Sequence, residues 1–202
     1  MPYIEQKYRD KIDKEVDALA LAVNKVFLEE KEKAKNITQR SSQVICSDID
    51  KDGKLEIPVT LDLPKQSGDS KNIYADKIIW NSFDAPKEAL VAKQAVIINY
   101  DYMFMMNYAD KWSENKVTAI TDLESETTSF YAWNGTKLDT ELFEIKVFPV
   151  SEWESGKSDD FTLITKDDKY AYTFNNINPD TQISLSDDEI KTGFSTLDQS
   201  GI

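Results

Sequence analysis

An acidic loop at residues 48–56, Asp-Ile-Asp-Lys-Asp-Gly-Lys-Leu-Glu, constrains the fold of this chain more than any other stretch. Its carboxylates stand at alternate positions, and Gly53 can adopt the positive φ that a tight loop requires. Hard cations such as Ca²⁺ take about six to eight oxygen ligands, and acidic loops supply them from loop positions 1, 3, 5, 7 and 9. We therefore predict a calcium site formed by Asp48, Asp50, Asp52, the carbonyl of Lys54, and Glu56.

The sequence around this loop predicts two flanking β-strands. A helix–loop–helix calcium site needs a Glu at position 12, where this chain has Val59. Apolar and polar residues alternate from Leu55 to Leu63, which is typical of a half-buried strand with its polar members and Pro58 facing outward. The apolar run at 44–46 predicts the preceding strand. The alternative interpretation is an ordinary Asp/Gly-rich surface turn without a metal.

Residues 47–58 resemble the calcium loops of FG-GAP/VCBS repeats, the hairpin loops of integrin-like propellers, in which D-x-D-x-D-G-x-x-D/E precedes a strand. The sequence has no second copy, so the chain by itself does not predict a propeller. The wider range 36–198 is similar to the C-terminal region of secreted lipoproteins of Gram-positive gut bacteria, through Trp80, Trp112 and Trp133. This resemblance implies a cell-surface protein that carries a lipid anchor in its full-length form.

Charge and composition exclude several classes of function. The formal net charge of −13 disfavours nucleic acids and anionic membranes as partners, because both need basic patches. The chain has no histidine, which removes His-dependent triads and imidazole metal sites. Its single cysteine, Cys46, cannot form an intrachain disulfide, and its apolar surroundings predict a buried thiol. No apolar run approaches the length of about 18 residues that a transmembrane helix requires.

The start of the chain, Met1-Pro2-Tyr3, contains no signal peptide. Cytosolic Ca²⁺ is scarce, whereas a site with a dissociation constant of about 10⁻⁴–10⁻³ M would be occupied outside the cell. We therefore expect an extracellular or cell-surface location, with this chain as part of a longer exported protein.

Hydrophobic periodicity predicts an α+β fold: an antiparallel sheet or curved half-barrel with an N-terminal helix and a short C-terminal helix. Residues 3–34 carry the helical pattern, so we divide the chain into an N-terminal helical segment, 1–36, and a β-rich domain, 37–202. A capping box formed by Ser186 and Glu189 predicts the start of the last helix. Strand candidates lie at 73–83, 90–100, 102–108, 117–121, 130–133, 143–150, 161–165 and 170–174. Asn134-Gly135 is suited to a tight hairpin turn.

These features favour a non-catalytic extracellular module with a structural Ca²⁺ ion and a protein or glycan partner. A secreted, carboxylate-based hydrolase and a carbohydrate-binding module are the alternatives. The aromatic residues between Tyr100 and Trp112 could form a platform for sugars, but we favour a role in the core. The many acidic residues single out no pair, so we name no catalytic residue.

Overall fold

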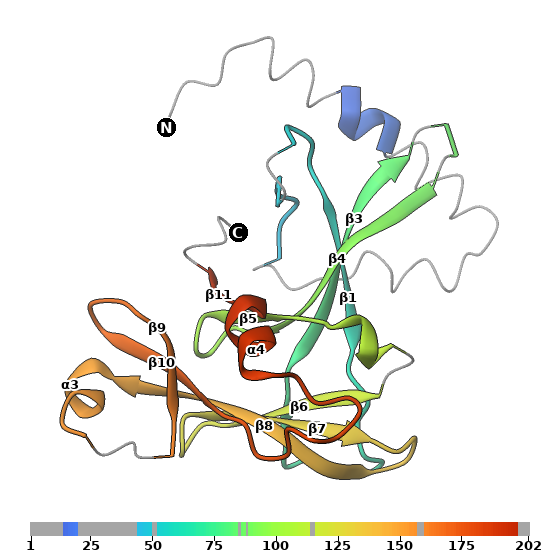
Figure 1. The fold of residues 1–202 in the computed structure, drawn as a ribbon. Helices are drawn as coiled ribbons and strands as arrows, with labels where there is room; N and C mark the ends of the chain where they lie inside the picture. The colour runs from blue at the N-terminus through green and yellow to red at the C-terminus, as the bar shows by residue number, and fades with distance from the viewer. Residues whose placement is uncertain are drawn as a thin grey trace. The chain divides into compact units, whose positions relative to one another are not determined.

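The computed structural model describes residues 14–19, 44–49, 52–84, 86–87, 89–113, 116–156 and 160–197. The chain divides into two compact units. Unit 1 comprises residues 1–59 and 80–93, and unit 2 comprises residues 60–79 and 94–202. Figure 1 shows the path of the chain. The predicted boundary at residue 36 falls outside the described residues and stays a prediction.

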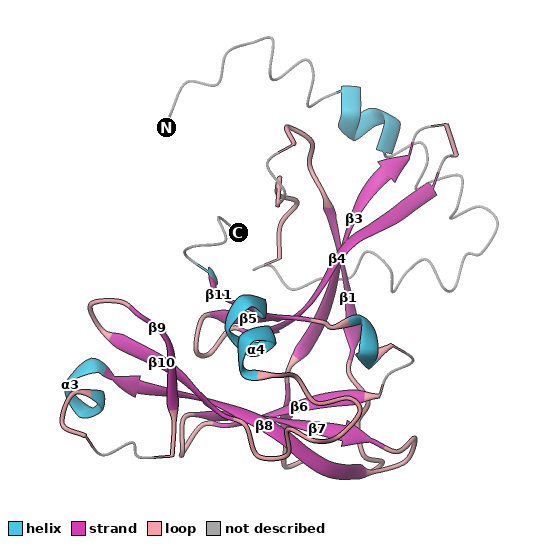
Figure 2. Cartoon of the chain, viewed as in Figure 1, coloured by secondary structure: helices cyan, strands magenta, loops and turns pink. Residues whose placement is uncertain are grey.

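The strands form two sheets, coloured magenta in Figure 2. The first has the order β1-β3-β4-β5-β11 and the second has the order β2-β6-β7-β8-β10-β9. The first sheet contains β1 (Ile57–Asp62), β3 (Asp76–Asp84), β4 (Ala89–Asn99), β5 (Phe104–Asn107) and β11 (Phe194–Thr196). The second contains β2 (Ile73–Tyr74), β6 (Val117–Asp122), β7 (Thr127–Trp133), β8 (Leu138–Pro149), β9 (Thr162–Lys166) and β10 (Tyr170–Asn175). The strands β1, β3 and β4 contribute residues to both units.

The predicted α+β class is wrong, because the described residues form a β-rich sandwich of mostly antiparallel strands with small helices. The helical elements are a segment at residues 14–19, η1 (Asp110–Trp112), α3 (Val150–Trp153) and α4 (Asp187–Gly193). The sequence also contained no sign of a switch between the two sheets at Ala75. The single strand predicted over 73–83 is two strands: β2 pairs with β6, the Ala75 N–H donates to the Ala119 carbonyl at 3.1 Å, and β3 joins the other sheet. Periodicity identifies strands but does not assign them to sheets.

The core of unit 2 lies between the inward faces of its strands. Trp112, Phe130 and Phe143 form a stack there, with ring centroids 4.3–6.2 Å apart, and all three are fully buried. The Trp112 indole N–H donates to the Ile183 carbonyl at 2.8 Å, so its polar atom is satisfied inside the core. Phe104 and Met106 of β5 are also buried, which confirms the core interpretation of the aromatic run at 100–112.

Local signals in the sequence correctly place several turns and caps. Ser186 caps α4: its hydroxyl accepts from the Glu189 N–H, and the Glu189 carboxylate accepts from the Ser186 N–H. The turn after β7 is built on Asn134, whose side-chain oxygen accepts from the Thr136 and Lys137 N–H groups at 3.1 Å. Gly135 adopts φ 99°, as this hairpin turn requires.

The predicted orientation is wrong over the first part of β1, whereas Asp62 is exposed and Leu63 is buried, as predicted. Glu56 and Pro58, expected to face outward, are buried, whereas Leu55 and Leu61 are 43% and 41% exposed. The predicted strand at 44–46 is also absent, and Ser47 instead makes a single antiparallel bridge with Glu56. Which face of a strand is buried depends on the neighbouring strands and not on its own alternation.

No helix among the described residues is both long and apolar enough to cross a membrane.

Candidate functional site

The acidic loop of unit 1 closes at its base through backbone hydrogen bonds. The Glu56 N–H donates to the Ser47 carbonyl at 2.8 Å, and the Ser47 N–H donates to the Glu56 carbonyl at 3.3 Å. The two ends of the predicted calcium loop are therefore fixed side by side. The strand β1 begins at the next residue, Ile57, so one flank of the loop is anchored in a sheet.

Asp48 organises the turn inside this loop. One of its carboxylate oxygens accepts from the Asp52 N–H at 3.0 Å, and the other accepts from the Gly53 N–H at 2.9 Å. Gly53 has φ 84°, which confirms the predicted positive φ and lets the chain turn back over Asp48. Each carboxylate oxygen can accept more than one bond, so Asp48 retains the capacity to bind a cation.

Asp52 lies at the exposed side of the same turn. Its carboxylate accepts from the Lys54 N–H at 2.9 Å, and the Lys54 ammonium lies 3.4 Å from its second oxygen. The hydrogen bond from the Lys54 backbone, followed by that from its side chain, outweighs desolvation and lowers the pKa of Asp52. The charged form that a metal ion needs is therefore favoured at this position.

Glu56 differs from the other predicted ligands because it is fully buried. One of its carboxylate oxygens, Oε2, accepts from the Ile49 N–H at 3.0 Å, which holds the carboxylate inside the loop. The other oxygen, Oε1, is buried and has no hydrogen-bond partner among the described residues. A buried carboxylate oxygen without a partner is costly, and a cation bound in the loop would satisfy it.

The structure therefore brings Asp48, Asp52, Lys54 and Glu56 into one turn, while Asp50 lies outside the described residues. Among the residues that the structure does describe, no three Asp, Glu or Cys side chains are gathered as a ready metal cluster. The residues fit a Ca²⁺ ion by the chemistry of their donors, which are all oxygens, and by the unpartnered oxygen of Glu56.

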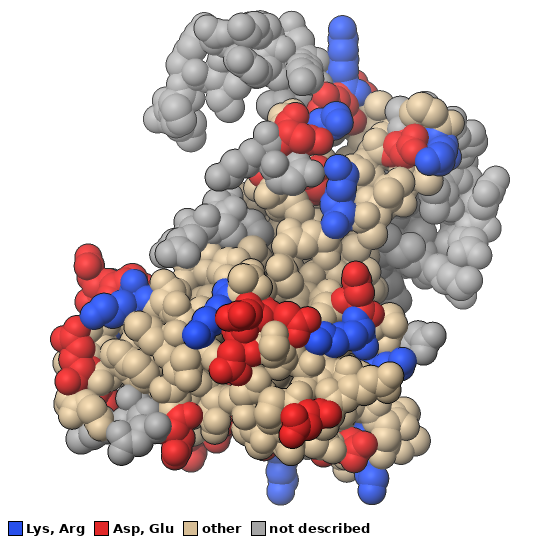
Figure 3. Space-filling model, in the orientation of Figure 1, with Lys and Arg blue, Asp and Glu red and all other residues tan. Residues whose placement is uncertain are grey.

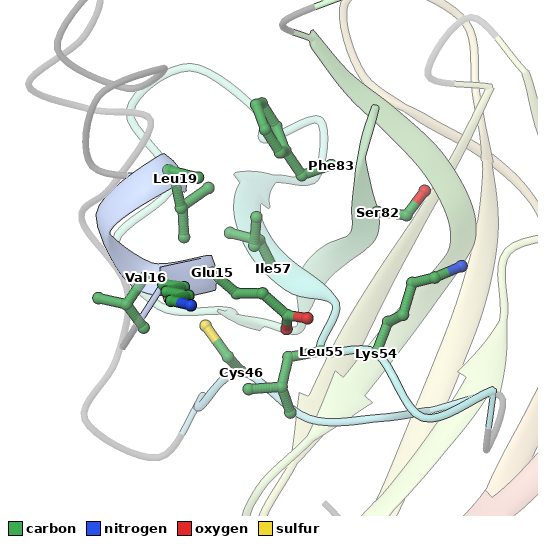
Figure 4. Close-up of a pocket in the computed structure, with 11 residues that line it drawn as sticks. Glu15, Val16, Leu19, Cys46, Lys54, Leu55, Ile57, Ser82 and Phe83 are labelled. Carbon is green, nitrogen blue, oxygen red and sulfur yellow. The ribbon is translucent and has the colours of Figure 1, made fainter. Parts of the chain in front are cut away.

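A pocket of about 320 Å³ lies next to this loop within unit 1 (Figure 4). Val16 and Leu19 of the helical segment line one side, and Leu55 and Ile57 line another. Cys46, predicted to be buried, is instead half-buried and faces this pocket. Residues 44–46 form no strand, and Val44 of the same run is buried.

A second hollow, of about 510 Å³, lies in unit 2 on the face of the second sheet that points away from the core. It is lined by outward-facing residues of β6, β7 and β8 together with residues before β2 and β9. This site was not predicted from the sequence. One signal was present: Thr127, Ser129, Tyr131 and Trp133 alternate with core residues along β7, but the predicted strand began only at Phe130.

Charged side chains are mixed on the molecular face that Figure 3 shows, where acidic groups alternate with single lysines. This distribution gives no support to a nucleic-acid interface, which would need a continuous basic surface. Comparison of the chain with protein-family models, with curated proteins and with solved structures found no significant match.

Proposed function

We propose that this chain is an extracellular, non-catalytic binding module, and that the loop at residues 48–56 binds one structural Ca²⁺ ion. The observation that carries the proposal is the buried Glu56 carboxylate, which has one oxygen bonded to the Ile49 N–H and the other without a partner in the part of the chain that the structure describes. Asp48 and Asp52 supply further oxygens in the same turn, and Asp50 and the Lys54 carbonyl complete the set predicted from the spacing.

The bound ion would raise the free energy of unfolding of the chain. When bound, it would neutralise carboxylates that otherwise repel one another and would tie the turn at Asp48 to the base of the loop at Glu56. A dissociation constant of about 10⁻⁴–10⁻³ M is sufficient for extracellular calcium modules, which is why we place the protein outside the cell. The chain's partner would be a protein or a glycan.

Thermal unfolding in EDTA and in ~1 mM CaCl₂ tests the site, with MgCl₂ as the comparison ion. With a dissociation constant of about 10⁻⁴–10⁻³ M, linkage at ~1 mM Ca²⁺ adds about 0.4–1.4 kcal/mol to the free energy of unfolding. For a chain of this size we expect the Tm to rise by about 1–6 °C. An equal Tm in EDTA and in CaCl₂ would contradict the proposal.

The variant Glu56→Gln separates metal binding from folding, because it keeps the shape of the side chain and removes its charge. It should lose the Ca²⁺-dependent rise in Tm and should be at least as stable as the wild type in EDTA, since a buried charge has been removed. Glu124→Gln, at an exposed position outside the loop, is the matched control and should retain the full rise. A full Ca²⁺ response in Glu56→Gln would show that Glu56 is not a ligand.

A further inference from the structure

We propose that the hollow on the outward face of the second sheet in unit 2 binds a neutral saccharide, with Tyr131 as the surface on which a sugar ring stacks. This inference rests on the proposed function, because it names the partner class of the binding module and the place where that partner sits. The hollow is built from residues of unit 2 alone.

The hollow is a polar surface on a rigid support. The pairing of β6, β7 and β8 places Ile120, Ser129 and Glu144 in one cross-strand row, and Asn175 of β10 extends that row. The Asn175 amide donates to a Glu144 carboxylate oxygen at 3.2 Å, which orients this carboxylate on the sheet. Side chains held on paired strands keep a fixed spacing, which suits a ligand with regularly spaced hydroxyl groups.

Aromatic and polar groups are combined in the lining. Tyr131 is half-buried on β7, and Phe161, just before β9, is also half-buried. The Phe161 ring is fixed by an edge contact with Phe148, at 5.5 Å between ring centroids. Sugars present apolar C–H faces and a rim of hydroxyl groups, so they need a flat aromatic ring together with hydrogen-bonding side chains. A volume of about 510 Å³ is within the range of about 300–1,000 Å³ typical of ligand sites.

The charges of the lining favour a neutral ligand. Asp122 and Glu144 are acidic, and Lys146 is the basic residue among those that line the hollow. The Lys146 ammonium lies 5.0 Å from the centroid of the Phe148 ring and 6.0 Å from that of Phe161, so it is engaged with aromatic faces. Partial burial of the Glu144 carboxyl group is the main cause that raises its pKa. Anionic ligands would meet two carboxylates and an already negative protein.

Other ligand classes fit less well. The site is on the face of the sheet and not at a strand edge, so an extended peptide could not bind by adding a strand. A lipid would need an apolar groove, whereas Asn72, Ser129 and Glu144 line this hollow with polar atoms. A neutral oligosaccharide uses both the polar side chains and the Tyr131 ring.

Affinity gel electrophoresis of the whole chain tests the proposal, with laminarin, xyloglucan, galactomannan and pullulan as neutral probes and heparin as an anionic probe. The runs contain CaCl₂. We expect at least one neutral polysaccharide to retard the protein, and Tyr131→Ala to weaken that binding by about ten-fold or more. Tyr170→Ala is the matched control, because Tyr170 is 46% exposed on β10 and does not line the hollow. Glu144→Gln should also weaken binding while keeping the Tm of the wild type.

Absence of retardation by all four neutral polysaccharides would overturn the proposal, and so would retardation by heparin alone. Equal binding by Tyr131→Ala and wild type, with both proteins folded by thermal unfolding, would place the ligand elsewhere and overturn it as well. Release of shorter saccharides from the bound probe would show turnover and contradict a non-catalytic module. The Ca²⁺ titration of Glu56→Gln is a separate measurement, so failure of the calcium site and failure of the saccharide site are distinguishable.

Discussion

Among single residues, Asn99 makes the clearest individual contribution to the sandwich of unit 2. Its amide nitrogen donates to the hydroxyls of Thr121 and Thr128 at 2.9 Å and 2.8 Å, which ties the end of β4 to β6 and β7 of the other sheet. Its amide oxygen accepts from the Tyr102 N–H at 2.9 Å. The side chains of Asn99, Thr121 and Thr128 are buried, and Tyr102 packs against the core. The hydrogen bonds of Asn99 are therefore satisfied within the protein.

Replacing Asn99 by Ala should lower the free energy of unfolding by about 1–3 kcal/mol, because buried polar groups lose their partners. Urea unfolding measures the change. Gln94→Ala is the control on the same strand, since the Gln94 amide bonds to Asn107 at the surface, at 2.7 Å. Its effect should stay within about 0.5 kcal/mol. A loss in Gln94→Ala as large as that in Asn99→Ala would contradict the role assigned to the buried network.

At the scale of elements, α4 depends on its first turn. Ser186 and Glu189 form the reciprocal capping box, and the Lys111 ammonium donates to the same Glu189 oxygen at 2.9 Å. Lys111 also donates to the Ser184 carbonyl at 2.8 Å, so the start of the helix is tied to η1. One face of this short helix carries Ile190, which is fully buried in the core of unit 2. Capping matters here because a helix this short has little intrinsic stability.

Ser186→Ala should destabilise the protein by about 0.5–2 kcal/mol through loss of the cap. Hydrogen exchange should also show faster exchange of the Glu189 and Ile190 amides, since local opening of α4 becomes easier. Ser151→Ala, at an exposed position in α3, serves as the matched control. Unchanged exchange in Ser186→Ala would show that tertiary packing alone holds the helix.

On the scale of the whole molecule, hydrogen bonds lower the pKa of several described carboxyl groups. Asp69 is the strongest case: it accepts from the Tyr74 hydroxyl at 2.7 Å and from the backbone of Lys71 and Asn72, which together lower its pKa to about 2. Hydrogen bonds from nearby residues also lower the pKa of Asp52, Asp84, Asp122, Asp167 and Glu189. Burial raises the pKa of Asp76 and Glu144, so protonation of these two groups on acidification favours the folded state.

The protein should therefore lose stability on acidification. A carboxyl group with a lowered folded-state pKa stabilises the fold above its unfolded pKa, near 3.8 for Asp69, and that contribution is lost as the pH falls towards about 2. Urea midpoints between pH ~5 and ~2.5 should fall as the pH decreases, and the fall should be shallower in Asp69→Asn. Asp139→Asn, at an exposed position on β8, is the control. A midpoint that stays constant or rises over this range would contradict the assignment.

Features that depend only on neighbours along the chain could be predicted from the sequence. The turn at Asn134-Gly135, the capping box of α4 and the positive φ of Gly53 were predicted correctly, because each is set by side-chain to backbone bonds within a few residues. The spacing of the predicted calcium ligands in the loop is likewise a property of residues close together in the chain.

Tertiary structure alone decided the rest. A strand pattern has a period of two but does not state which face will be covered, so Glu56 and Pro58 were expected outside and are buried. The switch between sheets at Ala75, which makes the fold a sandwich, depends on the pairing of β2 with β6, residues far apart in sequence. The hollow around Tyr131 likewise joins residues from Asn72 to Phe161. Caps, turns and ligand spacing depend on consecutive residues, whereas burial and sites on a sheet face depend on pairing between strands that are far apart in the sequence.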